Sequence, residues 1–325
     1  MRLRIARTAS ALIIGLVFVG GCTAPKENEP APRGEERIVS LAPSITETLF
    51  ALGAGPEVVG VSRYCDYPKA VLSLPKVGDF LTPNIEAIAA TRPTFVIGLI
   101  SSSDQREFRA LRAMGYRTLM VTGDDSLTEI EDQIRQIGDA IARHDEAQRL
   151  VGAIRMRIES IEERLRGVTA RRVLMVVGHQ PMVAVGQGTY LDDLLTLAHA
   201  ANIADASGQT WPRLSIEYII ATRPEVIIDG QMGTDPTTPD AFWGEYATIP
   251  AVLNHSVHGY PEDPTLHPGP RVAQSLEILA RLIHPEAFQR EAHNQGDAAG
   301  IAARRYGTHD VASRIGAGPM PRTAQ

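Results

Sequence analysis

The chain has 325 residues, of which 44% are hydrophobic, so it can bury a substantial core and suggests about two domains. Its net charge is −6, and no basic block or aromatic-interleaved basic stripe occurs along it. This composition excludes the electrostatic pattern typical of nucleic-acid binders, so we expect no nucleic acid among its partners.

The first residues have the pattern of a secretory signal. Arginines in the first seven residues precede the apolar run Ala11 to Val19, which is too short to span a bilayer, and Gly20-Gly21-Cys22 follows. The small residues before Cys22 resemble the lipobox of bacterial lipoproteins. This resemblance implies that residues 1–21 are removed and that lipid on Cys22 tethers the protein outside the cytoplasm, in the periplasm or at the cell surface. An ordinary cleaved signal with an incidental cysteine is the alternative.

Residues 22–36 are rich in proline, glutamate and lysine and predict a flexible spacer. Cys65 is the only other cysteine, so we expect neither a disulfide nor a cysteine-based zinc site within one chain.

The segment 37–143 alternates strands with helices, which predicts a parallel sheet covered on both faces. Ser44-Ile45-Thr46-Glu47 has the pattern of a capping box and predicts a helix that begins there and ends near Gly53. The other expected elements are strands at 37–42, 57–61, 94–100 and 117–121 and an amphipathic helix at 104–114.

Residues 126–166 have a helical pattern, and His144-Asp145 is where we expect it to break. We expect one helix to about Arg143 and a long one from Asp145 to Arg166, within a connecting segment 144–168. A coiled coil is the alternative, but the apolar spacing drifts. The second lobe, 169–289, is expected to hold strands at 172–178 and 225–229 and helices at 191–201 and 271–283. Residues 290–325 lack usable periodicity and predict a mobile tail.

Two stretches of the chain are nearly identical: Asn84-Ile85-Glu86-Ala87-Ile88-Ala89-Ala90-Thr91-Arg92-Pro93 and Ser215-Ile216-Glu217-Tyr218-Ile219-Ile220-Ala221-Thr222-Arg223-Pro224. Their glutamates lie 131 residues apart, at 86 and 217. Asn84 and Ser215 are N-cap residues, so each glutamate lies near the positive end of a helix and should be exposed and ionised. The repeat predicts two similar lobes. That the glutamates only complement helix dipoles is the alternative.

The run Arg37 to Glu47, with Val58 to Val61 and Tyr64-Cys65-Asp66-Tyr67-Pro68, resembles the substrate-binding proteins of cobalamin ABC importers. That group also includes binders of iron-siderophores and haem. The resemblance covers roughly residues 37–284. It implies an α/β fold of two parallel-sheet lobes joined by a single long backbone helix, the class III substrate-binding protein fold, acting as a monomer. The ligand would lie between the lobes and pass to an ABC permease dimer with its ATPase.

The resemblance also implies roles for single residues. Glu86 and Glu217 match the paired glutamates that dock onto permease arginines. Tyr64 matches a tyrosine that contacts the corrin, with Asp66 in the same loop. The aromatic walls of the site would come from Phe80 and, on the opposite lobe, Trp211. For each aromatic residue, ordinary core packing is the alternative.

A second contact loop of the family corresponds weakly to Asp263–His267, because Pro264 replaces the family's aromatic residue. His267 is a candidate axial ligand of haem iron or corrinoid cobalt, since neutral imidazole suits transition metals. The same role is considered for His179, His255 and His258. A solvated surface histidine is the alternative.

Haem or a ferric siderophore is the alternative ligand within this family. A corrinoid-modifying enzyme with Asp66 and Asp263 as a carboxylate pair, and a membrane-linked ligand sensor, are the competing classes. The sequence contains no G-x-S-x-G, H-E-x-x-H, P-loop or Rossmann glycine fingerprint, so we expect no catalytic residues, no resident metal and no cofactor. The single connecting helix further predicts small closure of the lobes.

Overall fold

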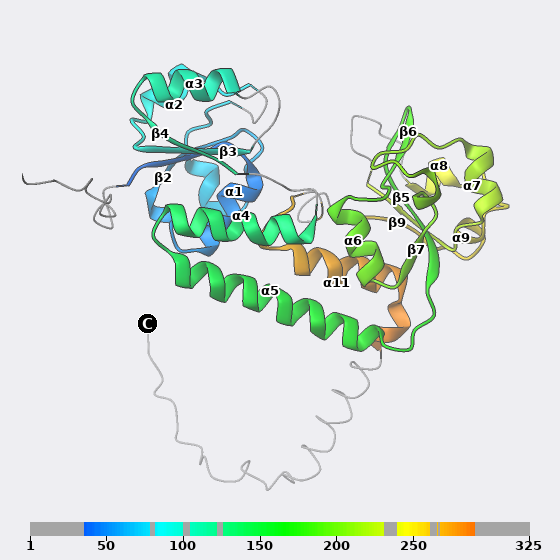
Figure 1. Ribbon diagram of the computed structural model, residues 1–325. Coiled ribbons are helices and arrows are strands. Elements are labelled where there is room, and N and C mark those ends of the chain that lie inside the picture. Colours follow the sequence, from blue (N-terminus) through cyan, green and yellow to red (C-terminus); the bar gives the residue numbers. More distant parts are fainter. Residues whose placement is uncertain are drawn as a thin grey trace, which may run out of the picture.

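The computed structural model describes residues 36–289 apart from 79–81, 100–104, 122–125, 231–238, 261–264 and 266. This part forms two α/β lobes, and the long helix α5 (His144–Leu165) runs beneath both (Figure 1). The predicted fold class is confirmed. No helix within the described ranges combines the length and the apolar character needed to cross a membrane.

The N-terminal lobe contains a four-stranded parallel sheet of order β2-β1-β3-β4. Its strands are β1 (Ile38–Ser40), β2 (Val58–Val61), β3 (Phe95–Leu99) and β4 (Arg117–Val121), and its helices are α1 (Pro43–Ala51), η1 (Gly55–Glu57), η2 (Lys69–Ser73), α2 (Ile85–Ala90), α3 (Gln105–Ala113) and α4 (Leu127–Ala140). Val96 packs with Ile88 of α2 and Phe108 of α3 on one face. Ile97 faces the cluster that contains Ile45 of α1. Helices therefore cover both faces, as the alternating pattern predicts.

The C-terminal lobe contains a five-stranded sheet of order β6-β5-β8-β9, with β7 beside β5. Among the described strands of this sheet, β6 alone runs antiparallel to its neighbour, because it returns from β5 in a hairpin. The strands are β5 (Arg171–His179), β6 (Met182–Ala184), β7 (Ala200–Asn202), β8 (Val226–Asp229) and β9 (Val257–Gly259), and the helices are α6 (Tyr190–Leu197), η3 (Asp205–Ser207), α7 (Ile216–Thr222), α8 (Pro239–Trp243), α9 (Pro250–Leu253) and α11 (Val272–Ile283).

Two local predictions are wrong. The helix expected over 191–201 ends at Leu197, because residues 200–202 form β7 and pair with the start of β5. The capping box at Ser44 does not form. The helix α1 starts at Pro43, two residues earlier than a Ser44 N-cap would place it. Ala42 is at the N-cap without a side-chain cap, so Ser44 and Glu47 lie inside the helix.

One apolar cluster joins the two lobes. It includes Ile134 of α4, Ile154 of α5 and Leu279 of α11, and it continues to β1 in one lobe and β5 in the other. Helix α11 packs against both α5 and α6, and Figure 1 shows it running below the space between the lobes. The lobes are therefore held by a shared core as well as by the connecting helix.

Candidate functional site

The repeated segments form equivalent helices, α2 and α7. The Asn84 side chain accepts a hydrogen bond from the Ala87 backbone N–H at 2.9 Å, and Ser215 Oγ accepts one from the Tyr218 N–H at 3.2 Å. These bonds confirm the predicted N-caps. In Figure 1 both helices lie on the side of the molecule opposite α5, one on each lobe.

Glu86 and Glu217 occupy the second position of their helices, and both are exposed, as expected. The backbone N–H of Glu217 and the Ser215 hydroxyl lower the pKa of the Glu217 carboxyl, so this side chain is ionised at neutral pH. The arrangement displays one acidic group from each lobe on the same side of the protein.

The repeat continues beyond the sequence match. Arg37 Nε donates to the Arg92 carbonyl at 2.9 Å, and Arg172 Nε donates to the Arg223 carbonyl at 3.0 Å. Arg92 and Arg223 both adopt left-handed backbone conformations, with φ of 49° and 51°. Each acidic helix is thus fixed at its C-terminal end by an arginine at the start of a neighbouring strand. Sequence reasoning missed this pair because the two arginines keep a different offset from the repeat.

The loop after β2 presents its aromatic side chains outward. Tyr64 is 51% and Tyr67 44% exposed, and Asp66 is also exposed. Between them Cys65 is buried, with its Sγ 3.1 Å from both Thr46 Oγ1 and Ser62 Oγ. Burial raises the pKa of the Cys65 thiol, which keeps it neutral. The cysteine anchors the loop while its neighbours face solvent.

Trp211, on the opposite lobe, is 48% exposed. Its segment runs along β6, since Ala184 N–H donates to the Pro212 carbonyl at 3.0 Å and Gly186 N–H to the Thr210 carbonyl at 2.8 Å. A Cβ at Gly186 would lie 2.1 Å from the Gln209 carbonyl oxygen, so this close approach requires glycine. The backbone pairing holds a large aromatic side chain at the edge of the sheet.

The two predicted contact loops meet at a buried ion pair. Arg271, at the N-cap of α11, binds Glu47 of α1 through two contacts, Nε to Oε2 at 2.7 Å and Nη2 to Oε1 at 2.5 Å. The guanidinium also lies 3.9 Å from the centre of the Tyr67 ring. His267 Nδ1 lies 3.7 Å from Glu47 Oε1. Sequence reasoning missed Glu47 and Arg271, which are 224 residues apart.

A second buried polar cluster lies at the carboxyl ends of β5 and β8. Asp229 Oδ2 accepts hydrogen bonds from the Trp243 indole N–H at 2.7 Å and contacts His179 Nε2 at 2.7 Å. The His179 ring stacks on Phe242 with 4.0 Å between ring centres, and its side chain is 3% exposed. These contacts hold the His179 side chain inside the C-terminal lobe.

The structure leaves several predicted residues untested. Phe80, Asp263 and Cys22 lie outside the described residues and remain predictions. His258 lies in β9 and His255 two residues before it, at a φ of 53°. Among the residues that the structure describes, no group of three or more His, Cys, Asp or Glu side chains is placed to hold a metal ion.

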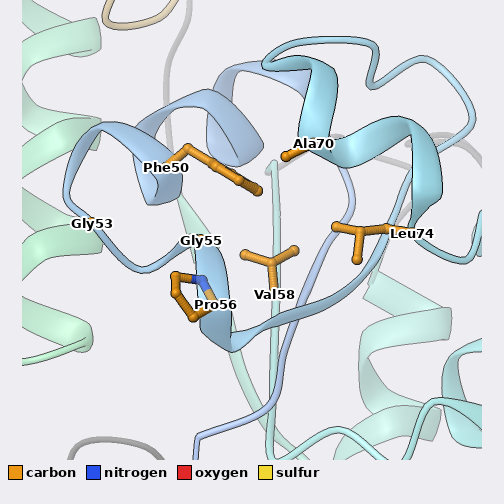
Figure 2. Close-up of a pocket in the computed structure, with 7 residues that line it drawn as sticks. All are labelled: Phe50, Gly53, Gly55, Pro56, Val58, Ala70 and Leu74. Carbon is orange, nitrogen blue, oxygen red and sulfur yellow. The ribbon is translucent and has the colours of Figure 1, made fainter.

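Two of the surface pockets lie on the N-terminal lobe. The first, drawn in Figure 2, lies between the end of α1, the start of β2 and η2. It is lined by Phe50, Gly53, Gly55, Pro56, Val58, Ala70 and Leu74. The second lies beside α2 and includes Arg37 and Arg92. Neither contains a residue of the two predicted contact loops.

Comparison with known proteins places these features in a family. The family model described as "Periplasmic binding protein" matches residues 38–264. An uncharacterized ABC transporter substrate-binding lipoprotein, YvrC, from Bacillus subtilis is 28% identical, over 86% of this chain and 97% of its own. A vitamin B12-binding protein of Vibrio cholerae is 29% identical, over 78% of this chain and 90% of its own.

The solved structure of the periplasmic heme-binding protein RhuT from Roseiflexus sp. RS-1, in its apo form, superposes with a TM-score of 0.70 at 28% identity. The match covers 78% of this chain and all of that one. The family match spans both lobes and the connecting helix α5. The chain belongs to the periplasmic binding protein family.

Proposed function

We propose that this protein captures a corrinoid between its two lobes and delivers it to an ABC permease. The observation that carries this proposal is the pair of half-exposed aromatic side chains, Tyr64 on one lobe and Trp211 on the other. Rigid aromatic walls suit a flat macrocycle, because they gain large apolar burial at low entropic cost. The similarity to a vitamin B12-binding protein supports a corrinoid as the macrocycle.

Haem is the second candidate ligand, and a ferric siderophore belongs to the same alternative. The similarity to a heme-binding protein favours haem. His267 supports it chemically, since its side chain is partly exposed and imidazole can bind haem iron. In the corrinoid proposal His267 contacts the ligand from the second loop. Asp66 of the first loop and Asp263 of the second make polar contacts to the substituents of the corrin ring.

We assign permease docking to Glu86 and Glu217. The two carboxylates are exposed, and the helices that carry them, α2 and α7, lie one on each lobe on the side opposite α5 (Figure 1). Close charge pairs across protein interfaces have coupling energies of about 1.5 to 7 kcal/mol, and two separated pairs also fix orientation. The partner would be a permease dimer that carries arginines at matching positions.

Anchoring at Cys22 completes the proposal. A signal peptide over residues 1–21 and lipid on Cys22 would tether the protein at the outer side of a membrane, with residues 22–36 as the spacer. The relative from Bacillus subtilis carries the word lipoprotein in its name, which supports this arrangement.

The test is titration of the purified protein with cyanocobalamin, haemin and a ferric siderophore, followed by calorimetry and tryptophan fluorescence. We expect submicromolar binding of cyanocobalamin. Burying the exposed half of an aromatic side chain contributes about 2 kcal/mol, so Trp211→Ala should weaken binding roughly thirtyfold.

Met156→Ala is the matched control, because Met156 is an exposed apolar residue on α5, far from both contact loops in sequence. If only haemin binds tightly, haem rather than a corrinoid is the ligand. Absence of binding by all three ligands would reject the proposal.

A further inference from the structure

The two ligand-contact loops share one structural support. The first loop, Tyr64–Pro68, follows β2 of the N-terminal lobe, and the second leads from β9 of the C-terminal lobe into α11. The second loop is held at Thr265, whose carbonyl accepts a hydrogen bond from Tyr190 Oη at 2.7 Å, and at Arg271, which binds Glu47. Gly269 lies against Ser44 of α1. The segment 267–271 therefore packs on the N-terminal lobe although its chain comes from the other.

The Glu47–Arg271 pair is buried and geometrically specific. The Glu47 side chain is 1% exposed and the Arg271 side chain 12%. Two parallel N–H···O contacts fix the plane of the guanidinium, which a lysine ammonium cannot reproduce. Because burial of either charge alone is costly, each partner depends on the other.

The fixed guanidinium plane also faces the Tyr67 ring at 3.9 Å. Tyr67 is half-exposed and lies two residues after the buried Cys65, so the guanidinium adds a contact on the outward-facing part of the loop. A guanidinium over an aromatic face is attracted by the ring quadrupole. One arginine thus connects α1, the first loop and the second loop.

We infer that Arg271 is a positioning residue, which holds the Tyr64–Pro68 loop and the segment 267–271 in one fixed relation before the ligand arrives. This inference rests on the proposed function for its consequence in binding. A loop that is ordered in advance loses less conformational entropy when the ligand binds, so affinity depends on the arginine although it need not touch the ligand. Arg271 would act through Glu47 and Tyr67.

The test compares Arg271→Lys, Tyr67→Leu and the double variant. Amide hydrogen exchange of the ligand-free protein measures loop order without any ligand. In Arg271→Lys and in Tyr67→Leu we expect exchange in a peptide covering residues 62–74 to accelerate at least about fivefold, with β5 and β8 unchanged. Binding of cyanocobalamin and haemin is titrated on the same variants.

Each single variant should weaken binding of the cognate ligand about two- to fivefold, the range expected from loss of an exposed cation–π contact. The double variant should bind no worse than the weaker single variant, because both changes break one unit. Tyr67→Phe keeps the ring under the guanidinium and should bind more tightly than Tyr67→Leu.

Arg281→Lys is the matched control. Arg281 is also on α11 and also donates from Nε and Nη2 to a glutamate, Glu277, but both bonds go to one oxygen, Oε1, and the pair is more exposed. Unchanged exchange in residues 62–74 of Arg271→Lys would overturn the inference, and so would fully additive losses of affinity. If the wild-type chain binds neither ligand, the proposed function fails, whereas exchange still decides whether Arg271 orders the loop.

Discussion

Trp243→Phe should destabilise the C-terminal lobe far more than the same change at Trp211. Trp243 is fully buried, and its indole N–H donates to the buried carboxylate of Asp229 at 2.7 Å. Phenylalanine lacks this donor, and loss of a hydrogen bond to a charged group costs about 1.5 to 3 kcal/mol. The smaller ring also leaves a void beside Phe242 and Tyr246, whose ring centres lie 5.1 and 6.2 Å from the centre of the indole. We expect a total loss of about 2 to 4 kcal/mol in the free energy of unfolding.

The assay is urea unfolding followed by circular dichroism. Tryptophan fluorescence is unsuitable, because each variant removes one of the two tryptophans. Trp211→Phe is the internal comparison. The Trp211 ring is half-exposed and lies outside the buried core, so this substitution should change the unfolding free energy by less than about 0.5 kcal/mol. Equal destabilisation by both variants, or a loss below about 1 kcal/mol at Trp243, would refute the view that Asp229 depends on the indole.

Alanine at both Glu86 and Glu217 should abolish ligand uptake by cells that carry the cognate permease, while ligand titration of the same preparation controls for folding; normal uptake would rule out the docking role. Burial, and then the neighbouring Asp192 carboxylate, raise the pKa of Asp205 from 3.8 to about 6. At Asp205 the folded state therefore binds more protons than the unfolded state between these values, so this group makes the unfolding free energy fall as pH rises from about 4 to 6. Asp205→Asn should remove this contribution, and a difference between the wild-type and variant unfolding free energies that does not change over this pH range in urea titrations would contradict the assignment. Cys22→Ser should release the mature protein from membranes in fractionation and eliminate labelling by a fatty-acid analogue; continued labelling would place the lipid elsewhere.

The predictions from the sequence were most accurate for structural features that neighbouring residues determine. The N-caps at Asn84 and Ser215, the long helix α5 and the strand after each Thr-Arg-Pro triplet follow from local hydrogen bonding, apolar spacing and proline geometry. These features hold wherever the segment lies in the fold. The position and exposure of the two acidic helices could therefore be inferred from one chain.

Local patterns failed where a distant partner decides the structure. Ser44 to Glu47 has the pattern of a capping box, but Glu47 instead accepts the guanidinium of Arg271, 224 residues away. Similarly, the helix expected over 191–201 includes Ala200 and Ala201, yet residues 200–202 form a strand because the start of β5 offers an unpaired edge. Neither partner is visible in a short window, so no periodicity could have identified it.

The same distant contacts determine how far the lobes can move. A single connecting helix already resists bending between the lobes. Here α4, α5 and α11 share one buried cluster that continues into both sheets, so separation of the lobes would expose apolar side chains such as Ile154 and Leu279 to water. Each such side chain costs about 1.5 to 3 kcal/mol on exposure. We therefore expect only small closure of the lobes on ligand binding, and a large change in solution scattering between the ligand-free and ligand-bound protein would contradict this prediction.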